Sequence, residues 1–326
     1  MASLPFENGV SNNIVALPNG HLLVHQHGQI IWLFDSQSKL WSAPTTVPSQ
    51  KHRNIVYGFM NEISNGHYQL FGFHRGTISI WQIRQNPLQM TLEREWHCVI
   101  SASIEPVKIH YIDGKFHIWS WRLYVVLSDQ GKELQCQQGI FGGGSSVYSP
   151  KTKSLFSFAA TKEAQYPPVP STMVAECQPG DKKWNFVDSM KLPIPLRNPV
   201  AVCTTNGEFC IILGGISTNN LGPRWSINYQ IFVFNTMTKQ CRTSAVTLRR
   251  GQITTRIAAA IVSNSKNDGL VVVGYIRRVM AKIQVQFPDD LIEYMVQWIS
   301  TEYLHIFDGP SVIHSTFNVD DVLCCY

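Results

Sequence analysis

Short apolar runs recur along the chain, each one following a turn-forming Asn-Gly or Asp-Gly pair. Both central residues of a type I′ turn need positive φ angles, which these pairs accept at the lowest cost. The runs themselves are rich in β-branched and aromatic residues, as is typical of strands. Five of these pairs are directly followed by an apolar, strand-like run, namely Asn19-Gly20, Asn65-Gly66, Asp113-Gly114, Asn206-Gly207 and Asp268-Gly269. The pattern predicts a series of β-hairpins.

The hairpins follow one another at a repeating distance. Successive pairs are 46, 48, 93 and 62 residues apart, and the longest gap holds a degenerate turn at 151–153. In each of the six resulting units, a strand of small residues precedes the turn, and two more strands follow the second one. Repeats of this period are typical of propeller blades. The sequence therefore predicts a single all-β domain over residues 1–326, a six-bladed β-propeller of four-stranded antiparallel blades, with blades at about 11–53, 54–105, 106–140, 141–197, 198–251 and 252–326.

The last unit contains an insertion that does not have a strand pattern. Pro288 followed by two aspartates favours a helix start, and apolar residues then recur at helical spacing up to Ile299. We expect a short helical insertion at about 276–302. The third and fourth strands of this unit are then expected at 303–307 and 311–317.

Motifs in several units resemble those of the kelch-repeat propellers. The fifth unit has Gly214-Gly215 after its second strand and Tyr229 before its third, while other units keep a tryptophan beyond the turn, such as Trp41 or Trp184. The resemblance spans nearly the whole chain with degenerate motifs. It implies a rigid ring whose loops bind a ligand.

Composition and charge narrow the function classes. A net charge of +5 without basic clusters argues against nucleic-acid binding. The sequence has no run of 18 uncharged apolar residues and so predicts no membrane span, and residues 1–10 do not resemble a signal peptide. Eight scattered cysteines without Cys-x-x-Cys spacing indicate reduced thiols in a cytoplasmic protein. We predict no cofactor and no metal site, interpreting His21, His25 and His27 as ordinary strand residues.

The candidate binding residues lie in two sets of loops. The loops that join one blade to the next, and those between second and third strands, open on the same face of a propeller. Arginine guanidinium groups there would hold carboxylates in bidentate fashion. The candidates are Arg53, Ser101, Ser103, Arg197, Asn198, Asn219, Asn220, Arg224, Arg249 and Arg250.

Two function classes remain open at this point. The first is a non-enzymatic scaffold or adaptor that binds a protein or an acidic peptide through this loop face, acting as a monomer or as a subunit of a complex. The alternative is an enzyme, a hydrolase or a metal-dependent oxidoreductase, with its site at the channel mouth. Propellers host both. Three or more converging histidines or carboxylates would favour the enzyme, and we expect the binding module.

Overall fold

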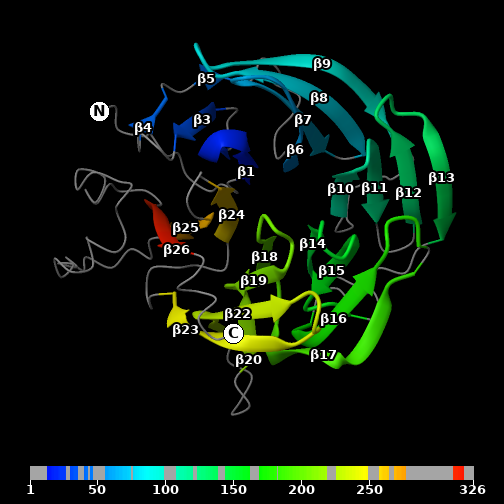
Figure 1. Ribbon diagram of the computed structural model, residues 1–326, viewed down its shortest axis with the longest axis vertical. Coiled ribbons are helices and arrows are strands. Elements are labelled where there is room, and N and C mark those ends of the chain that lie inside the picture. Colours follow the sequence, from blue (N-terminus) through cyan, green and yellow to red (C-terminus); the bar gives the residue numbers. More distant parts are fainter. Residues whose placement is uncertain are drawn as a thin grey trace.

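The chain forms an all-β ring of antiparallel sheets (Figure 1). The computed structural model describes residues 13–26, 30–35, 40–42, 45–46, 56–74, 76–98, 108–119, 123–138, 144–161, 169–181, 183–218, 225–248, 257–263, 268–276 and 311–318. Every strand pair in these ranges is antiparallel, because each strand returns beside its predecessor through a turn or loop.

Five sheets have the four strand positions of a propeller blade. The first contains β1 (Asn13–Leu17), η1 (Pro18–Gly20), β2 (His21–Gln26) and β3 (Ile30–Asp35), with β4 (Leu40–Trp41) and β5 (Thr45–Thr46) both paired to β3. The second contains β6 (Val56–Ser64), β7 (His67–His74), β8 (Thr77–Arg84) and β9 (Gln89–His97). The third contains β10 (Lys108–Ile112), β11 (Lys115–Trp119), β12 (Leu123–Ser128) and β13 (Glu133–Gln138). The fourth contains β14 (Ser145–Ser149), β15 (Ser154–Phe158), β16 (Ser171–Cys177) and β17 (Asn185–Leu196).

The fifth sheet carries an additional ribbon. Its four strands are β18 (Val200–Cys203), β19 (Phe209–Leu213), β22 (Gln230–Asn235) and β23 (Cys241–Thr247). Between β19 and β22, the strands β20 (Ile216–Thr218) and β21 (Trp225–Ile227) pair with each other as a separate two-stranded ribbon. A last sheet contains β24 (Ile257–Ser263), β25 (Asp268–Ile276) and β26 (Ser311–Asn318).

The last sheet corrects the predicted arrangement of six equal blades. In the described ranges four blades have four strands, the first has five because β4 and β5 both pair with β3, and β24–β26 is a sheet of three strands. Strand β26, predicted as a fourth strand, pairs directly with β25 over its whole length, from Gly269↔Asn318 to Ile276↔Ser311, and so takes the third position. The strand predicted at 303–307 and, beyond Ile276, the helical insertion lie outside the described residues.

A turn or loop lies at four of the five predicted pairs, but only Asp113-Gly114 has the two positive φ angles of a type I′ turn, because Asn19, Asn65 and Asn206 do not have a positive φ. Asp113 and Gly114 have φ angles of 50° and 75°, as a type I′ turn requires. Lys153, in the degenerate turn, also has a positive φ of 55°. Asp268 and Gly269, however, lie inside β25, paired with Ser263 and Val262. This pair is therefore part of the strand and not of the turn.

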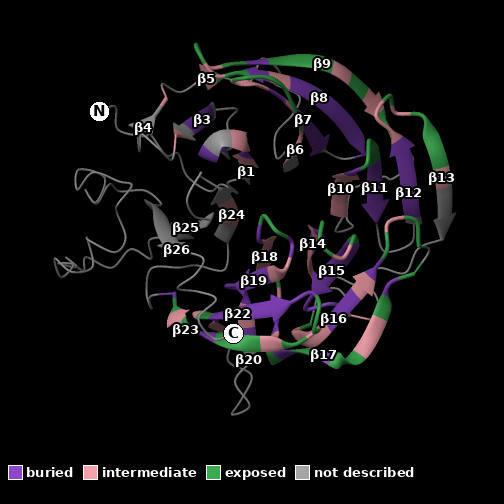
Figure 2. Ribbon diagram, viewed as in Figure 1, coloured by how far each residue is buried: buried purple, intermediate pink, exposed green. Residues whose placement is uncertain are grey.

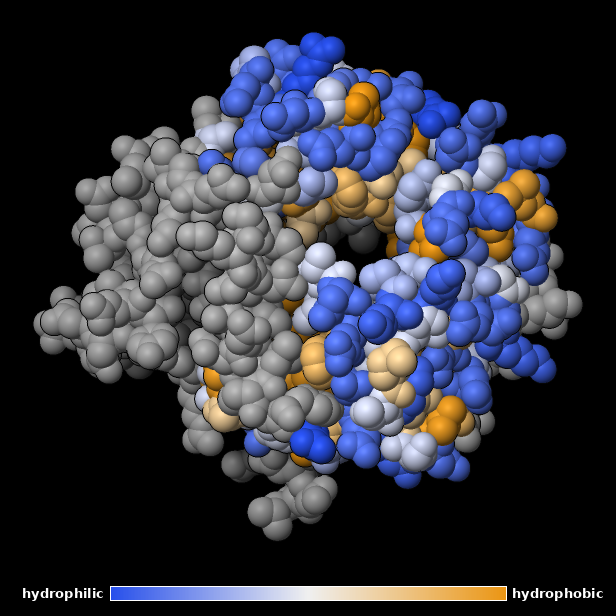
Figure 3. All heavy atoms as spheres, viewed as in Figure 1, coloured by the Kyte–Doolittle hydropathy of each residue, from blue (hydrophilic) through white to orange (hydrophobic). Residues whose placement is uncertain are grey.

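Innermost strands surround the centre of the ring in chain order (Figure 1). Strand β24 packs against both β18 and β1, and β6 packs against both β1 and β10. The first and last sheets therefore meet, and Figure 3 shows an opening at the centre of the ring.

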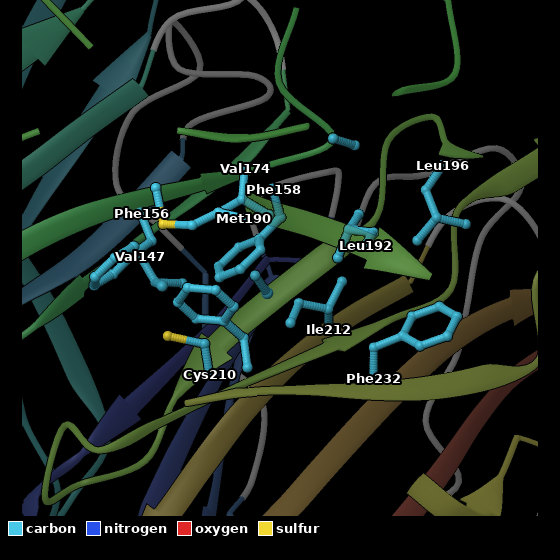
Figure 4. Packing of buried hydrophobic residues seen from close by; sticks show 13 residues of the cluster. Val147, Phe156, Phe158, Val174, Met190, Leu192, Leu196, Cys210, Ile212 and Phe232 are labelled. Carbon is cyan, nitrogen blue, oxygen red and sulfur yellow. The ribbon is translucent and has the colours of Figure 1, made fainter. Parts of the chain in front are cut away.

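The hydrophobic core lies between neighbouring sheets. One cluster joins the first and second sheets through residues such as Leu23 and Trp81, and another joins the fourth and fifth through Phe156, Phe158 and Phe234 (Figure 4). Buried residues concentrate on the middle strands, whereas the outer strands alternate with exposed positions (Figure 2). Neighbouring sheets thus bury their faces against each other.

Candidate functional site

Two of the ten predicted binding residues, Arg197 and Asn198, lie within the described part of the chain. They form the connection between the end of β17 and the start of β18, on the face where the innermost strands begin. The other eight lie outside the described residues, namely Arg53, Ser101, Ser103, Asn219, Asn220, Arg224, Arg249 and Arg250.

The Arg197–Asn198 connection is attached to the base of the β20–β21 ribbon. The backbone N–H of Arg197 donates to the Ile216 carbonyl at 2.8 Å, and the N–H of Ile216 donates back to Arg197 at 2.9 Å. Asn198 then takes a positive φ of 51°, and Pro199 is buried. Two loops that the sequence placed on one face are therefore joined by backbone hydrogen bonds.

Two glycines and a buried asparagine hold the base of the ribbon in place. Gly214 and Gly215 have φ angles of 65° and 80°. The Asn228 side chain, 4% exposed, donates to the carbonyls of Gly214 and Gln230 and accepts from the Gln230 N–H. Because every one of these partners is backbone, the ribbon leaves the ring at a defined angle.

A second polar group lies at the start of β10, on the same face. Lys108 is the first residue of this innermost strand, and His110 follows on the same side because successive side chains alternate. The His110 Nε2 is 2.8 Å from the Ser146 hydroxyl of the next innermost strand. Burial lowers the pKa of Lys108 to about 8 and that of His110 to about 3, with the Lys108 charge as a further cause for His110. At neutral pH, His110 is therefore uncharged.

The group continues outward along the third sheet. His117 lies opposite His110, and its Nδ1 is 2.7 Å from the Tyr124 hydroxyl. Tyr124 also accepts the Gly180 N–H of the fourth sheet at 2.8 Å. Burial lowers the pKa of His117 to about 4, so at neutral pH its free Nδ1 accepts the Tyr124 proton. The fully buried Trp119 stacks on Tyr124, with ring centroids 4.7 Å apart.

The three histidines of the first hairpin do not meet in one described group. The His21 ring hydrogen-bonds the Gln85 side chain at 2.7 Å and lies 3.9 Å from Asp35, His25 pairs with Ile31 in the sheet, and His27 lies outside the described residues. In the described ranges no three His, Cys, Asp or Glu side chains are placed to hold a metal ion. Within the same ranges no helix has the length and apolar character needed to cross a membrane.

Sequence reasoning missed Lys108 and His110 as parts of a site. Both were assigned to an innermost strand, where small residues were expected, and His110 was counted among dispersed histidines. The sequence did contain a signal. A lysine and a histidine lie two positions apart in a strand expected to be buried, although burying a charge costs free energy.

Comparison with known proteins supports the fold and leaves the family open. No family model matches the chain, and no curated protein sequence matches it. Among solved structures 891 chains match, so the fold is too common to indicate one activity. One of them, the structure of YjhT, is 10% identical with a TM-score of 0.55, covering 83% of this chain and 96% of its own. This chain thus has the fold of a β-propeller.

Proposed function

We propose that this protein is a non-enzymatic interaction module that binds an acidic segment of a partner protein through the face carrying Arg197 and Asn198. The observation that carries the proposal is the backbone bridge between Arg197 and Ile216, which joins an inter-blade connection to the β20–β21 ribbon. Joined loops lose less conformational freedom on binding than separate ones, which favours affinity. A rigid scaffold that presents loops is also a common arrangement for binding sites.

Charge on this face supports an acidic partner. Arg197 lies in the connection that leads to β18, and Lys108 is the first residue of β10, so both lie on the face where the innermost strands begin. Arginine forms paired, charge-assisted hydrogen bonds with carboxylates. Three or more converging histidines or carboxylates would favour the enzyme alternative, and in the described ranges no three His, Cys, Asp or Glu side chains are placed to hold a metal ion.

Three finer points belong to the same proposal. We infer that β24–β26 is the sixth blade, because β24 packs against the innermost strands of both the first and fifth sheets. We retain the kelch resemblance on its Gly214-Gly215 and Tyr229 motif. A cytoplasmic location fits the Cys203 and Cys210 thiols, which lie 3.9 Å apart as a hydrogen-bonded pair of free cysteines.

Arg197→Gln tests the proposal, with a fluorescein-labelled oligoglutamate peptide as the probe in fluorescence anisotropy. We expect the dissociation constant to rise about tenfold, because a charge-assisted hydrogen bond contributes about 1.5–3 kcal/mol. Raising the salt concentration should reduce the difference. Arg84→Gln is the matched control, since Arg84 is an exposed arginine at the end of β8, beside the β6–β7 turn on the opposite face. Equal weakening by both variants, or no binding by the wild-type protein, would exclude this face as the acidic-peptide site.

A further inference from the structure

The half-buried Lys108 has no counter-charge in the described part of the structure. No described carboxylate lies within ion-pair distance of its ammonium group, and no described residue hydrogen-bonds it. Its partner on the adjacent strand is Trp119, a fully buried aromatic residue that carries no charge. A cation taken partly out of water without compensation costs free energy, and an anion beside it would recover that cost.

The groups that the structure describes around Lys108 carry no negative charge either. His110 on its own strand and His117 on β11 are uncharged at neutral pH. Ser145 and Ser146 lie at the near end of the neighbouring strand β14. Ser146 contacts His110, and Ser145 accepts the Ala201 N–H of the fifth sheet, so three innermost strands are joined here.

The described acidic groups of the neighbouring innermost strands lie away from this end. Asp113 is in the turn at the far end of β10, where it influences Tyr148 of β14. Glu62 is exposed near the turn that ends β6. Burial is accordingly the cause that lowers the pKa of Lys108 to about 8. Among the described residues, this end of β10 and β14 is therefore polar and cationic, and the acidic groups of the innermost strands lie at the other end.

We propose that Lys108 anchors a carboxylate group that enters the channel from the loop face, beside His110 and Ser146. This inference rests on the proposed function for its natural ligand, an acidic side chain of the bound segment. Arg197 would hold that segment on the rim, and Lys108 would receive one of its carboxylates inside the opening. Because the carboxylate favours the charged amine, binding and protonation of Lys108 are coupled.

A titration of Lys108 with a small dicarboxylate tests this directly. Lysines are converted to ¹³C-dimethyl-lysines, and the Lys108 signal, assigned with Lys108→Arg, is followed by NMR from neutral to alkaline pH without and with succinate. We expect the Lys108 signal to titrate with a pKa of about 8 and this pKa to rise on adding succinate, whereas the signal of Lys115, an exposed residue of β11, should not respond to succinate. Failure of Lys108 to become methylated, a Lys108 pKa at the ordinary lysine value of 10.5, or no response to succinate would overturn the proposal. Inorganic phosphate in place of succinate identifies the alternative source of the anion, and a response to phosphate alone would overturn the carboxylate assignment.

Oligoglutamate binding separates this inference from the proposed function. Lys108→Met should weaken binding at pH 7 by about tenfold or more, and should abolish the loss of affinity that the wild-type protein shows as the pH rises above about 8. Lys115→Met is the matched control. Binding that depends on Arg197 but is unchanged in Lys108→Met would leave the interaction face intact and remove Lys108 from it. A succinate response without oligoglutamate binding would support the carboxylate site at Lys108 and exclude the proposed acidic-peptide face.

Discussion

Two histidines of the third sheet make the stability of the fold depend on pH. His110 and His117 are held uncharged, because burial lowers their pKa values from 6.5 to about 3 and about 4. The positive charge of Lys108 adds to this effect at His110. Both rings also make hydrogen bonds, to Ser146 and Tyr124, so they contribute to the contact between the third and fourth sheets.

The lowered pKa values predict that the protein loses stability in mild acid. Below pH 6.5 the unfolded chain binds protons at both histidines, while the folded chain binds them only near pH 4 and below. Stability is therefore full above pH 6.5 and falls as the pH decreases toward 4, at about 2.7 kcal/mol per pH unit if both sites contribute. Urea denaturation at pH 7, 6 and 5 measures the slope, and His110→Asn should reduce it by about half. A free energy of unfolding that is constant over this range would contradict the assignment.

At the scale of elements, the ribbon joined to the Arg197 connection depends on one glycine. Gly215 is buried with a φ of 80°, and a Cβ atom there would lie 2.9 Å from the Arg197 carbonyl oxygen and 3.0 Å from the Pro199 nitrogen. Gly114 offers a matched position, with a φ of 75° and open space around its added Cβ.

Gly215→Ala should therefore lower the free energy of unfolding by more than the strain of a positive φ alone. Gly114→Ala isolates that strain, about 1–2 kcal/mol, whereas Gly215→Ala adds a clash with two backbone atoms that cannot move independently. We expect Gly215→Ala to lower the free energy of unfolding further than Gly114→Ala and to weaken oligoglutamate binding, with Gly114→Ala binding normally. Chemical denaturation and anisotropy on both variants measure this. Equal effects of the two variants would show that the Arg197 bridge tolerates displacement.

Elements were more predictable from the sequence than their neighbours in space. Asp113-Gly114 forms the expected turn because both residues carry the positive φ that the motif encodes locally. Asp268-Gly269 has the same motif and lies within β25, because pairing with β24 and β26 overrides the local preference. The burial cost of Lys108 and His110 could have been read from the sequence, but the contact of His110 with Ser146 depends on how the third and fourth sheets pack. The place of β26 likewise depends on long-range pairing that no local pattern encodes.

For the whole molecule, stability depends on the contacts between sheets. Successive sheets share an apolar cluster from the first to the last, such as the one joining β19 and β22 to Ala259 and Ile261 of β24. Each sheet exposes apolar faces when its neighbour is removed, as in other repeat architectures where a unit is not stable alone. The Arg197–Asn198 connection keeps its position only while this ring is intact.

Phe234→Ala tests this dependence. Phe234 is fully buried in the cluster between the fourth and fifth sheets, with its ring centroid 5.3 Å from those of Phe156 and Phe158. Removing its ring should cost about 3–5 kcal/mol, whereas Leu134→Ala, at a 49% exposed position of β13, should change stability by less than about 0.5 kcal/mol. Because the sheets support one another, Phe234→Ala should lower the unfolding midpoint equally for probes in the second and fifth sheets. Separate midpoints, with the second sheet unchanged, would show that the ring unfolds in independent parts.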